Sequence, residues 1–199
     1  LRLVRKGSTN PANDDAYLMQ LVKACSQTLA LIDQQMSLWL ATSDIARFNS
    51  LAVGQDMLLP EPFATVTSKA FAICNETGGT FNPGLYEAVE QWGFGARDKA
   101  DPVASGLAFS KTRAAAPSLL DLLRGSVLTK REGFALDLNG IAKGYAVDLL
   151  CDVGRSHPDT AAICVEIGGE LKGFGTRADG MPFWVDLAPD GDEHNPRYR

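Results

Sequence analysis

Three residues suited to phosphate chemistry, Asp137, Gly140 and Lys143, are spaced three apart in the sequence. Residues 134–138 before the glycine alternate in polarity like a strand, and residues 141–149 after it have the apolar spacing of a helix. A strand-to-helix junction directs backbone N–H groups outward and favours an anion at the helix start. Because Asp137 can help hold a hard cation and Lys143 can meet a phosphate, the pattern predicts a nucleotide or phosphate site.

A purely structural role explains the same three residues. Gly140 can simply ease a tight turn, Asp137 can cap the helix that follows, and Lys143 can be a solvated charge in its first turns. The stretch alone favours neither interpretation.

Glycines mark two further turns, at 78–84 and 168–169, where the backbone can approach a ligand closely. However, no G-x-G-x-x-G follows a predicted strand, and no G-x-x-x-x-G-K-[ST] occurs. The sequence therefore argues against a dinucleotide-binding Rossmann domain and against a P-loop.

Two loops carry side chains that a flat ligand could use. Trp39 precedes a polar turn and is either a core residue or a stacking platform, and the core is the favoured prediction. Asn82-Pro83-Gly84 forms a constrained turn that exposes Thr80, Phe81 and Asn82. That turn can offer hydrogen bonds and a ring to a ligand, or it can be an ordinary loop between helices.

Hydrophobic periodicity and turn residues predict the elements that position these loops. Helices are predicted from about 13 to 36, from Ser43, from about 61 to 77, over 85–91, 117–123 and 140–153, and strands over 126–129, 134–138, 161–167, 170–175 and 183–187. The first two strands are expected to form a hairpin. The order predicts an α+β fold with a mainly antiparallel sheet and helices packed on one face. We expect a single domain over 1–199, with 96–116 as a surface linker or flap.

Composition narrows the function. A net charge of −5 without a run of Lys and Arg argues against a nucleic-acid partner, and no apolar run approaches the roughly 20 residues of a membrane span. No signal peptide is visible. The four cysteines are widely spaced in apolar patterns, so we expect buried thiols. With only two histidines, phosphate chemistry would depend on a divalent ion held by oxygens.

Three separated blocks resemble the ApbE family, the FAD:protein FMN transferases. They are SLWLATSDIARFN (37–49), GGTFNPGLYEAVEQWGFG (78–95) and LDLNGIAKGYAVDLL (136–150), and residues 165–190 resemble the block that follows in the family. The blocks occur in family order and at family spacing, and together they cover most of residues 37–190.

The resemblance implies an ApbE-like α+β fold with a T-fold-type core and a magnesium-dependent transferase. Such an enzyme moves FMN from FAD onto a threonine or serine hydroxyl of a partner flavoprotein and releases AMP. It also suggests the bacterial periplasm or the cell-envelope face as the compartment. By position in the blocks, the implied FAD contacts are Trp39, Thr80, Phe81, Asn82, Asp137 and Lys143, and the backbone carbonyl of Gly140 is an implied Mg²⁺ ligand.

The chain also departs from the family pattern. The Met-Gly-Thr strand near the family's start is missing, and so is the later H-x-x-D-P-x-T-G-like loop with the aspartate and threonine that complete the metal site. Asn82 stands where many relatives have aspartate. We therefore expect an ApbE-like domain that is incomplete at its C-terminus, in which no catalytic residue can be named. The alternative is a non-catalytic flavin-binding or trafficking module, or an inactive fragment of the same fold.

Overall fold

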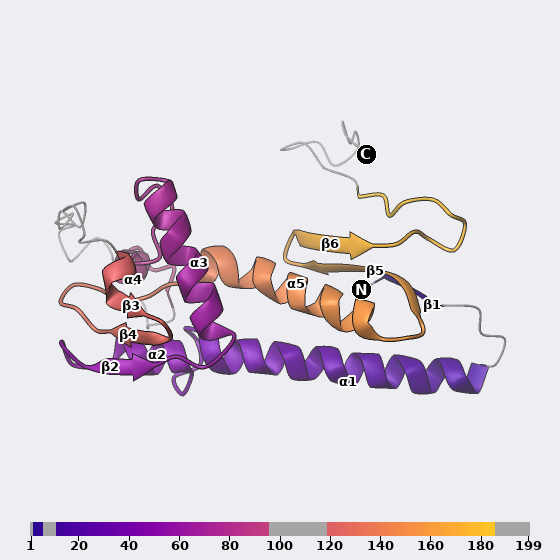
Figure 1. Cartoon of the computed structure of the whole chain (residues 1–199), viewed down its shortest axis with the longest axis horizontal. Coiled ribbons are helices and arrows are strands. Elements are labelled where there is room, and N and C mark those ends of the chain that lie inside the picture. The colour runs from indigo at the N-terminus through magenta and orange to yellow at the C-terminus, as the bar shows by residue number, and fades with distance from the viewer. Residues whose placement is uncertain (1, 6–10, 96–118, 186–199) are drawn as a thin grey trace. The chain divides into compact units, whose positions relative to one another are not determined.

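The computed structural model describes residues 2–5, 11–95 and 119–185, which form two compact units (Figure 1). One unit combines Leu1–Ser26 with Val147–Arg199, and the other is Gln27–Ala146. The described helices are α1 (Pro11–Met36), α2 (Asp44–Asn49), α3 (Phe63–Glu76), α4 (Tyr86–Gln91), the 3-10 helix η1 (Leu119–Leu122) and α5 (Asn139–Ser156). The described strands are β1 (Arg2–Arg5), β2 (Asp56–Leu58), β3 (Leu123–Arg124), β4 (Val127–Thr129), β5 (Thr160–Ile167) and β6 (Glu170–Phe174).

The predicted α+β class with antiparallel pairing is confirmed, but the strands do not form one sheet. Within the described residues there are two three-stranded antiparallel sheets, ordered β1-β5-β6 and β2-β4-β3. The expectation of one sheet was therefore wrong, while the packing of helices on a single face stays a prediction. The T-fold-type core stays a prediction, and so does the single-domain boundary.

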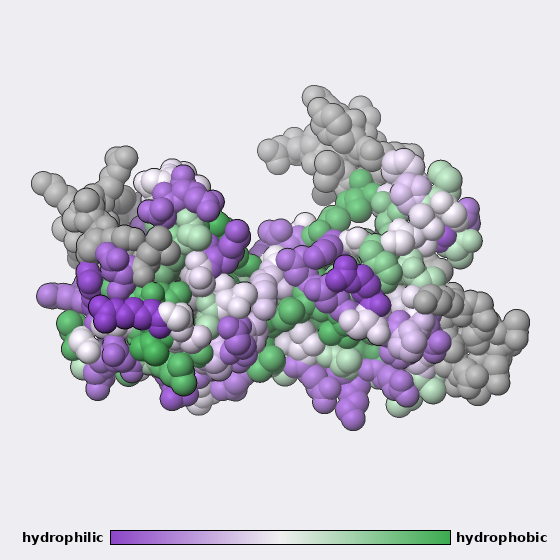
Figure 2. All heavy atoms as spheres, viewed as in Figure 1, coloured by the Kyte–Doolittle hydropathy of each residue, from purple (hydrophilic) through white to green (hydrophobic). Residues whose placement is uncertain are grey.

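The unit Gln27–Ala146 contains every residue of the predicted site. The helix predicted from Ser43 is α2, and Ser43 caps it, because its hydroxyl accepts a hydrogen bond from the N–H of Ala46 at 3.2 Å. Aromatic rings fill the centre of this unit, where Phe134 meets Phe48 and Phe71 edge-on at centroid distances of 6.2 and 6.1 Å. Figure 2 shows that apolar residues also reach the surface among polar ones, and both Val53, which precedes β2, and Leu58, the last residue of β2, are exposed.

The predicted strand over 134–138 and its hairpin with 126–129 were wrong. Residues 134–138 have no regular secondary structure, and β4 instead pairs with β2 and β3. The alternation was real in part, since Leu136 and Leu138 are buried while Asp137 is half-buried. The segment is held by the side chain of Asn49 and the carbonyl of Pro83 rather than by a neighbouring strand.

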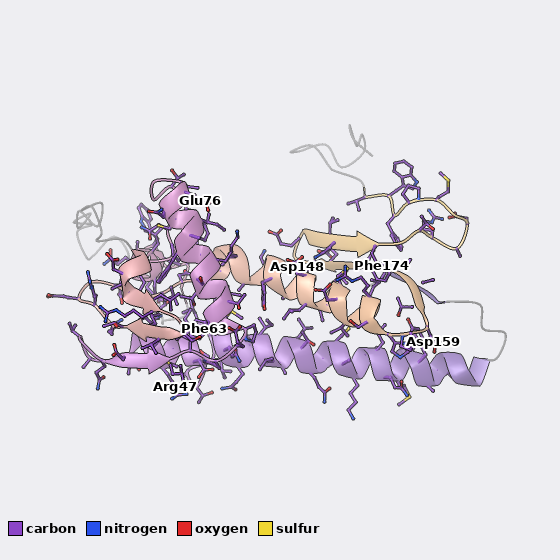
Figure 3. All side chains as sticks on the ribbon, viewed as in Figure 1. Arg47, Phe63, Glu76, Asp148, Asp159 and Phe174 are labelled. Carbon is purple, nitrogen blue, oxygen red and sulfur yellow. The ribbon has the colours of Figure 1, made fainter. Side chains whose placement is uncertain are left out.

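In the other unit, β5 runs between β1 and β6 and packs on α5. Its core is a cluster of buried apolar residues: Val147, Leu150, Cys151, Ile163 and Val165. Figure 3 labels Asp148 on α5 and Phe174 on β6 in this region. Lys172 on β6 donates a hydrogen bond of 2.7 Å to Asp148 on α5. A buried hydrogen bond of 2.7 Å also joins the hydroxyls of Tyr17 and Thr160.

Several short elements differ from the predictions. Strands β1 and β2 were not predicted, because runs of three or four residues give too little alternation to detect. Residues 183–185 have no strand, although one was expected over 183–187, and positions 186–187 lie outside the described residues. The predicted linker or flap at 96–116 lies outside them as well.

The environments of the four cysteines and of His157, the described histidine, indicate structural roles. All four thiols are free, and burial raises the pKa of Cys25, Cys74 and Cys151, which disfavours the reactive thiolate. His157 packs edge-on against Tyr17, and its Nδ1 accepts a hydrogen bond from the N–H of Asp159. Among the described helices, none has the length and apolarity that a bilayer crossing requires.

Candidate functional site

The first turn of α5 is built as a capped helix start. The N–H groups of Ile141 and Ala142 both donate to the carbonyl of Leu138, at 2.9 and 2.8 Å. The Asp137 carboxylate accepts a hydrogen bond from the N–H of Asn139 at 2.8 Å. The capping role considered for Asp137 is therefore present in the structure, and it leaves the second carboxylate oxygen for other partners.

The surroundings of Asp137 oppose its negative charge. Burial raises the pKa of this carboxyl, the hydrogen bond from Asn139 lowers it, and the nearby carboxylate of Glu90 raises it again. Taken together, these surroundings favour the protonated form of Asp137. A cation bound beside Asp137 would favour the carboxylate instead.

The turn after α3 is the second part of the site. Helix α3 ends at Glu76, and Gly78 and Gly79 follow with positive φ angles of 60° and 83°. Thr77 then accepts a hydrogen bond on its hydroxyl from the N–H of Phe81, at 3.2 Å. Asn82 closes the turn through a 2.8 Å hydrogen bond between its Oδ1 and the N–H of Gly84.

The two parts are in direct contact. The N–H of Asp137 donates to the carbonyl of Pro83 at 2.7 Å. The ring of Phe81 lies over Gly140, where an added Cβ would come within 3.2 Å of Phe81 Cε2. The structure thus brings Phe81, Asn82, Asp137 and Gly140 together, and it gives Gly140 a reason to lack a side chain.

A third contact reaches the same segment from α2. The side-chain Nδ2 of Asn49 donates to the carbonyl of Leu136 at 2.9 Å, and its Oδ1 accepts from the N–H of Leu136 at 2.7 Å. Lys130 donates from its Nζ to the carbonyls of Asn49 and Phe134, at 3.0 and 2.6 Å. Neither residue was singled out from the sequence, because a lone Asn and a lone Lys carry no spacing signal.

The remaining predicted residues lie on the surface of the same unit. Trp39 is 62 % exposed, so the expectation that it fills the core was wrong, and its neighbour Leu38 is buried instead. An exposed indole ring suits the other alternative, a stacking platform. Thr80 and Lys143 are exposed, with Thr80 on the glycine-marked turn and Lys143 one turn along α5 from Asn139.

The described residues offer only part of a metal site. Residues 2–5, 11–95 and 119–185 contain no group of three or more His, Cys, Asp or Glu side chains that could hold a metal ion. Near the start of α5 lie the carboxylate of Asp137, the carboxylate of Glu90 that acts on its pKa, and Gly140, three residues after Asp137. Mg²⁺ often takes only one or two carboxylates and completes its shell with water and substrate phosphates, so this partial set fits Mg²⁺ bound together with a pyrophosphate.

Fold and site together define an α+β protein in which a capped helix start contacts a glycine-marked turn. The model of the ApbE family matches residues 5–197, and the chain belongs to the ApbE family. It is 29% identical over 157 residues to an FAD:protein FMN transferase of Vibrio cholerae, covering 78% of this chain and 47% of that protein. An FAD:protein FMN transferase of Treponema pallidum is 25% identical over 170 residues, covering 77% and 45%.

A crystal structure of the Pseudomonas stutzeri flavinyl transferase ApbE in its apo form is similar to this fold. Its TM-score is 0.75 at 28% sequence identity, and the match covers 93% of this chain and 60% of that one. The ApbE-like fold is thereby confirmed for the described residues. The chain spans about half the length of the curated relatives it matches.

Proposed function

We propose that this chain binds FAD on the unit Gln27–Ala146 and transfers its FMN half to a threonine or serine hydroxyl of an acceptor protein. In this reaction the hydroxyl oxygen attacks the FMN-side phosphorus, a phosphoester bond forms, the pyrophosphate bond breaks, and AMP leaves while the hydroxyl proton is released. The observation that carries the proposal is the convergence of three separated blocks on one helix start. Asn49 contacts Leu136, Pro83 contacts Asp137, and Phe81 covers Gly140.

Each proposed contact has a physical basis. In the first turn of α5 the N–H groups of Asn139 and Ile141 already have acceptors, so the N–H of Gly140 and the helix dipole are what attract the pyrophosphate there. Lys143, exposed on the same helix, adds a positive charge within reach of a phosphate. Exposed Trp39 and the ring of Phe81 supply apolar surfaces for a flavin or adenine ring, and Thr80 and Asn82 supply polar groups.

We also propose that Asp137 and the carbonyl of Gly140 hold Mg²⁺ at this corner. When bound, the ion would neutralise charge on the pyrophosphate oxygens. Asp137 supports the assignment because its half-buried carboxylate lies just before α5 and uses one oxygen on the N–H of Asn139. The chain's own groups then orient the pyrophosphate, which is the larger part of catalysis in phosphoryl transfer.

The test is a reaction of the protein with FAD, Mg²⁺ and a candidate acceptor subunit, with AMP and covalent flavin measured together. We expect equal amounts of both products. Replacing Lys143 by Ala should weaken FAD binding by removing a phosphate contact, and replacing Asp137 by Ala should remove the Mg²⁺ dependence. Lys69, an exposed lysine on α3, provides the control: Lys69→Ala should bind FAD as the wild type does. Wild-type affinity in Lys143→Ala would contradict the assignment of this residue.

The second candidate is a non-catalytic flavin-binding or trafficking module. It is favoured by the incomplete metal-ligand set among the described residues. FAD fluorescence would then be quenched on titration, while no AMP would form with or without Mg²⁺. That result would exclude the transferase and keep the flavin site.

A further inference from the structure

Two polar side chains outside the proposed ligand contacts hold the backbone that leads into α5. Asn49 is the last residue of α2, and both its amide groups are used on a single residue, Leu136. One bond satisfies the Leu136 carbonyl and the other its N–H, as a neighbouring strand would do. Asp137 follows at once, so the side chain of Asn49 sets the path of the chain one residue before the carboxylate.

Lys130 also holds the segment that leads into α5, through hydrogen bonds from its ammonium group. Its Nζ bridges the carbonyls of Asn49 and Phe134, and it lies 5.4 Å from the centre of the Phe48 ring. The residue is only 8 % exposed, although lysine is seldom buried. Its backbone is fixed too, because Lys130 and residues 54–55 exchange N–H···O bonds of 2.8 Å.

The cost of this burial points to a specific task. Burial lowers the pKa of Lys130, and Glu87 acts in the opposite direction. An apolar residue of similar length would avoid the desolvation of a charge, but it could not join two carbonyl groups. The two hydrogen bonds of the ammonium fix the position of residue 134, three residues before Asp137, relative to the end of α2.

We propose that Asn49 and Lys130 are positioning residues of the FAD site. They hold residues 134–136 so that Asp137 and the first turn of α5 face the pyrophosphate in the geometry that binding requires. This inference rests on the proposed function, and it adds two residues that the family resemblance does not assign to the site. Neither residue is proposed to touch FAD.

The chain offers a matched control for the test. Gln35 uses its amide as Asn49 does: Oε1 accepts from the N–H of Phe63 at 2.9 Å, and Nε2 donates to the carbonyl of Glu61 at 2.9 Å. It is buried in the same unit, but it fastens the start of α3 rather than the start of α5. Asn49→Asp and Gln35→Glu therefore make the same chemical change, loss of one donor, at two different places.

The experiment measures FAD affinity by fluorescence titration and amide hydrogen exchange over 136–140, at a temperature well below the melting of each variant. We expect Asn49→Asp and Lys130→Met to bind FAD at least tenfold more weakly and to exchange faster at 136–140. Gln35→Glu should lose similar stability, yet bind FAD within about twofold of the wild type. Protonation of the carboxyl introduced by Asn49→Asp should restore a donor toward Leu136, so the affinity of this variant relative to that of the wild type at the same pH should rise as the pH is lowered.

Each outcome decides the proposal. Unchanged FAD affinity in both Asn49→Asp and Lys130→Met would overturn it, and so would an equal loss of affinity in Gln35→Glu, because the effect would then be one of stability alone. If Asn49→Asp does not fold, Lys130→Met still decides. A wild-type protein that binds no FAD would overturn the proposed function and the positioning role together. Hydrogen exchange distinguishes that failure from a failure of the positioning role alone. Unchanged exchange at 136–140 in Asn49→Asp and Lys130→Met would show that these two residues do not hold the segment.

Discussion

At the scale of single residues, Asp137 illustrates a conflict between stability and the proposed function. Burial and Glu90 raise the pKa of its carboxyl above the ordinary value of 3.8, against a smaller opposing effect of the Asn139 N–H. A raised pKa in the folded state means that the folded protein binds the proton more tightly than the unfolded chain does. The contribution of Asp137 to stability is therefore fully present below the ordinary pKa and is lost as pH rises through the folded pKa.

This sign gives a prediction for Asp137→Asn. The amide keeps an oxygen that can accept the N–H of Asn139, but it carries no charge at any pH. We expect the variant to melt at about the wild-type temperature near pH 3, and above it at pH 7, since only the wild type then holds a half-buried charge. Melting curves of both proteins from pH 3 to 7, without Mg²⁺, test the prediction. A difference in melting temperature that does not grow with pH would contradict it.

Trp39 allows a second prediction at this scale. Because its side chain is 62 % exposed, Trp39→Ala should change the free energy of unfolding by no more than about 0.5 kcal/mol. Stacking of a base on an aromatic ring is worth about 1–3 kcal/mol, so the loss of FAD affinity should be roughly 5- to 150-fold. Fluorescence titration measures the affinity, and chemical denaturation measures the stability.

Trp184 is the matched control for this variant. It is 46 % exposed and lies in the unit formed by Leu1–Ser26 and Val147–Arg199, not in the unit with the proposed site. Trp184→Ala should leave both stability and FAD affinity nearly unchanged. If Trp39→Ala binds FAD as tightly as Trp184→Ala does, Trp39 is not a stacking platform.

At the scale of elements, two glycines of α5, Gly140 and Gly144, differ in the space available around them. Both are helical, so replacing either by Ala should favour the helix by up to about 1 kcal/mol. A Cβ at Gly144 meets nothing within 4 Å, whereas a Cβ at Gly140 comes within 3.2 Å of the Phe81 ring. Gly144→Ala should therefore raise stability, and Gly140→Ala should gain less, because Phe81 has to shift.

The same pair of variants tests the proposed site. Displacement of Phe81 should weaken FAD binding in Gly140→Ala, while Gly144→Ala should bind FAD like the wild type. Thermal melting and titration of the two variants provide the comparison. Stronger FAD binding by Gly140→Ala than by Gly144→Ala would show that the contact between Phe81 and Gly140 is not needed.

The elements also show where sequence-based prediction succeeds and fails. Long periodic stretches with clear ends were predicted correctly, as in α1 and in α3 with its terminal glycines. The extended segment 134–138 was mistaken for a strand because alternation reports which side chains are buried, not what the backbone pairs with. An amide side chain can take the place of a neighbouring strand, as Asn49 does, and no periodicity reveals it.

At the scale of the whole molecule, the blocks of resemblance located the predicted site residues, and the structure brought several of them into contact. Phe81, Asp137 and Gly140 meet through the turn at Pro83, which pattern alone could not establish. Asn49 and Lys130 were not predicted because their roles depend on partners 87 and 81 residues away. Such pairings are properties of the folded chain and leave no local trace in the sequence.

The last prediction concerns the response of the protein to its proposed ligand. FAD at about 100 times its Kd should stabilise the binding-competent fold by about 2.7 kcal/mol, which for a chain of this size raises the melting temperature by roughly 5–10 °C. Because every proposed contact lies in Gln27–Ala146, hydrogen-exchange protection should increase there and not over β5 and β6. If Asp137 and Gly140 hold Mg²⁺ beside the pyrophosphate, EDTA should reduce the shift for the wild type but not for Asp137→Asn. No rise in melting temperature at saturating FAD would rule out the flavin site, whereas a rise that EDTA leaves unchanged would remove only the metal from the proposal.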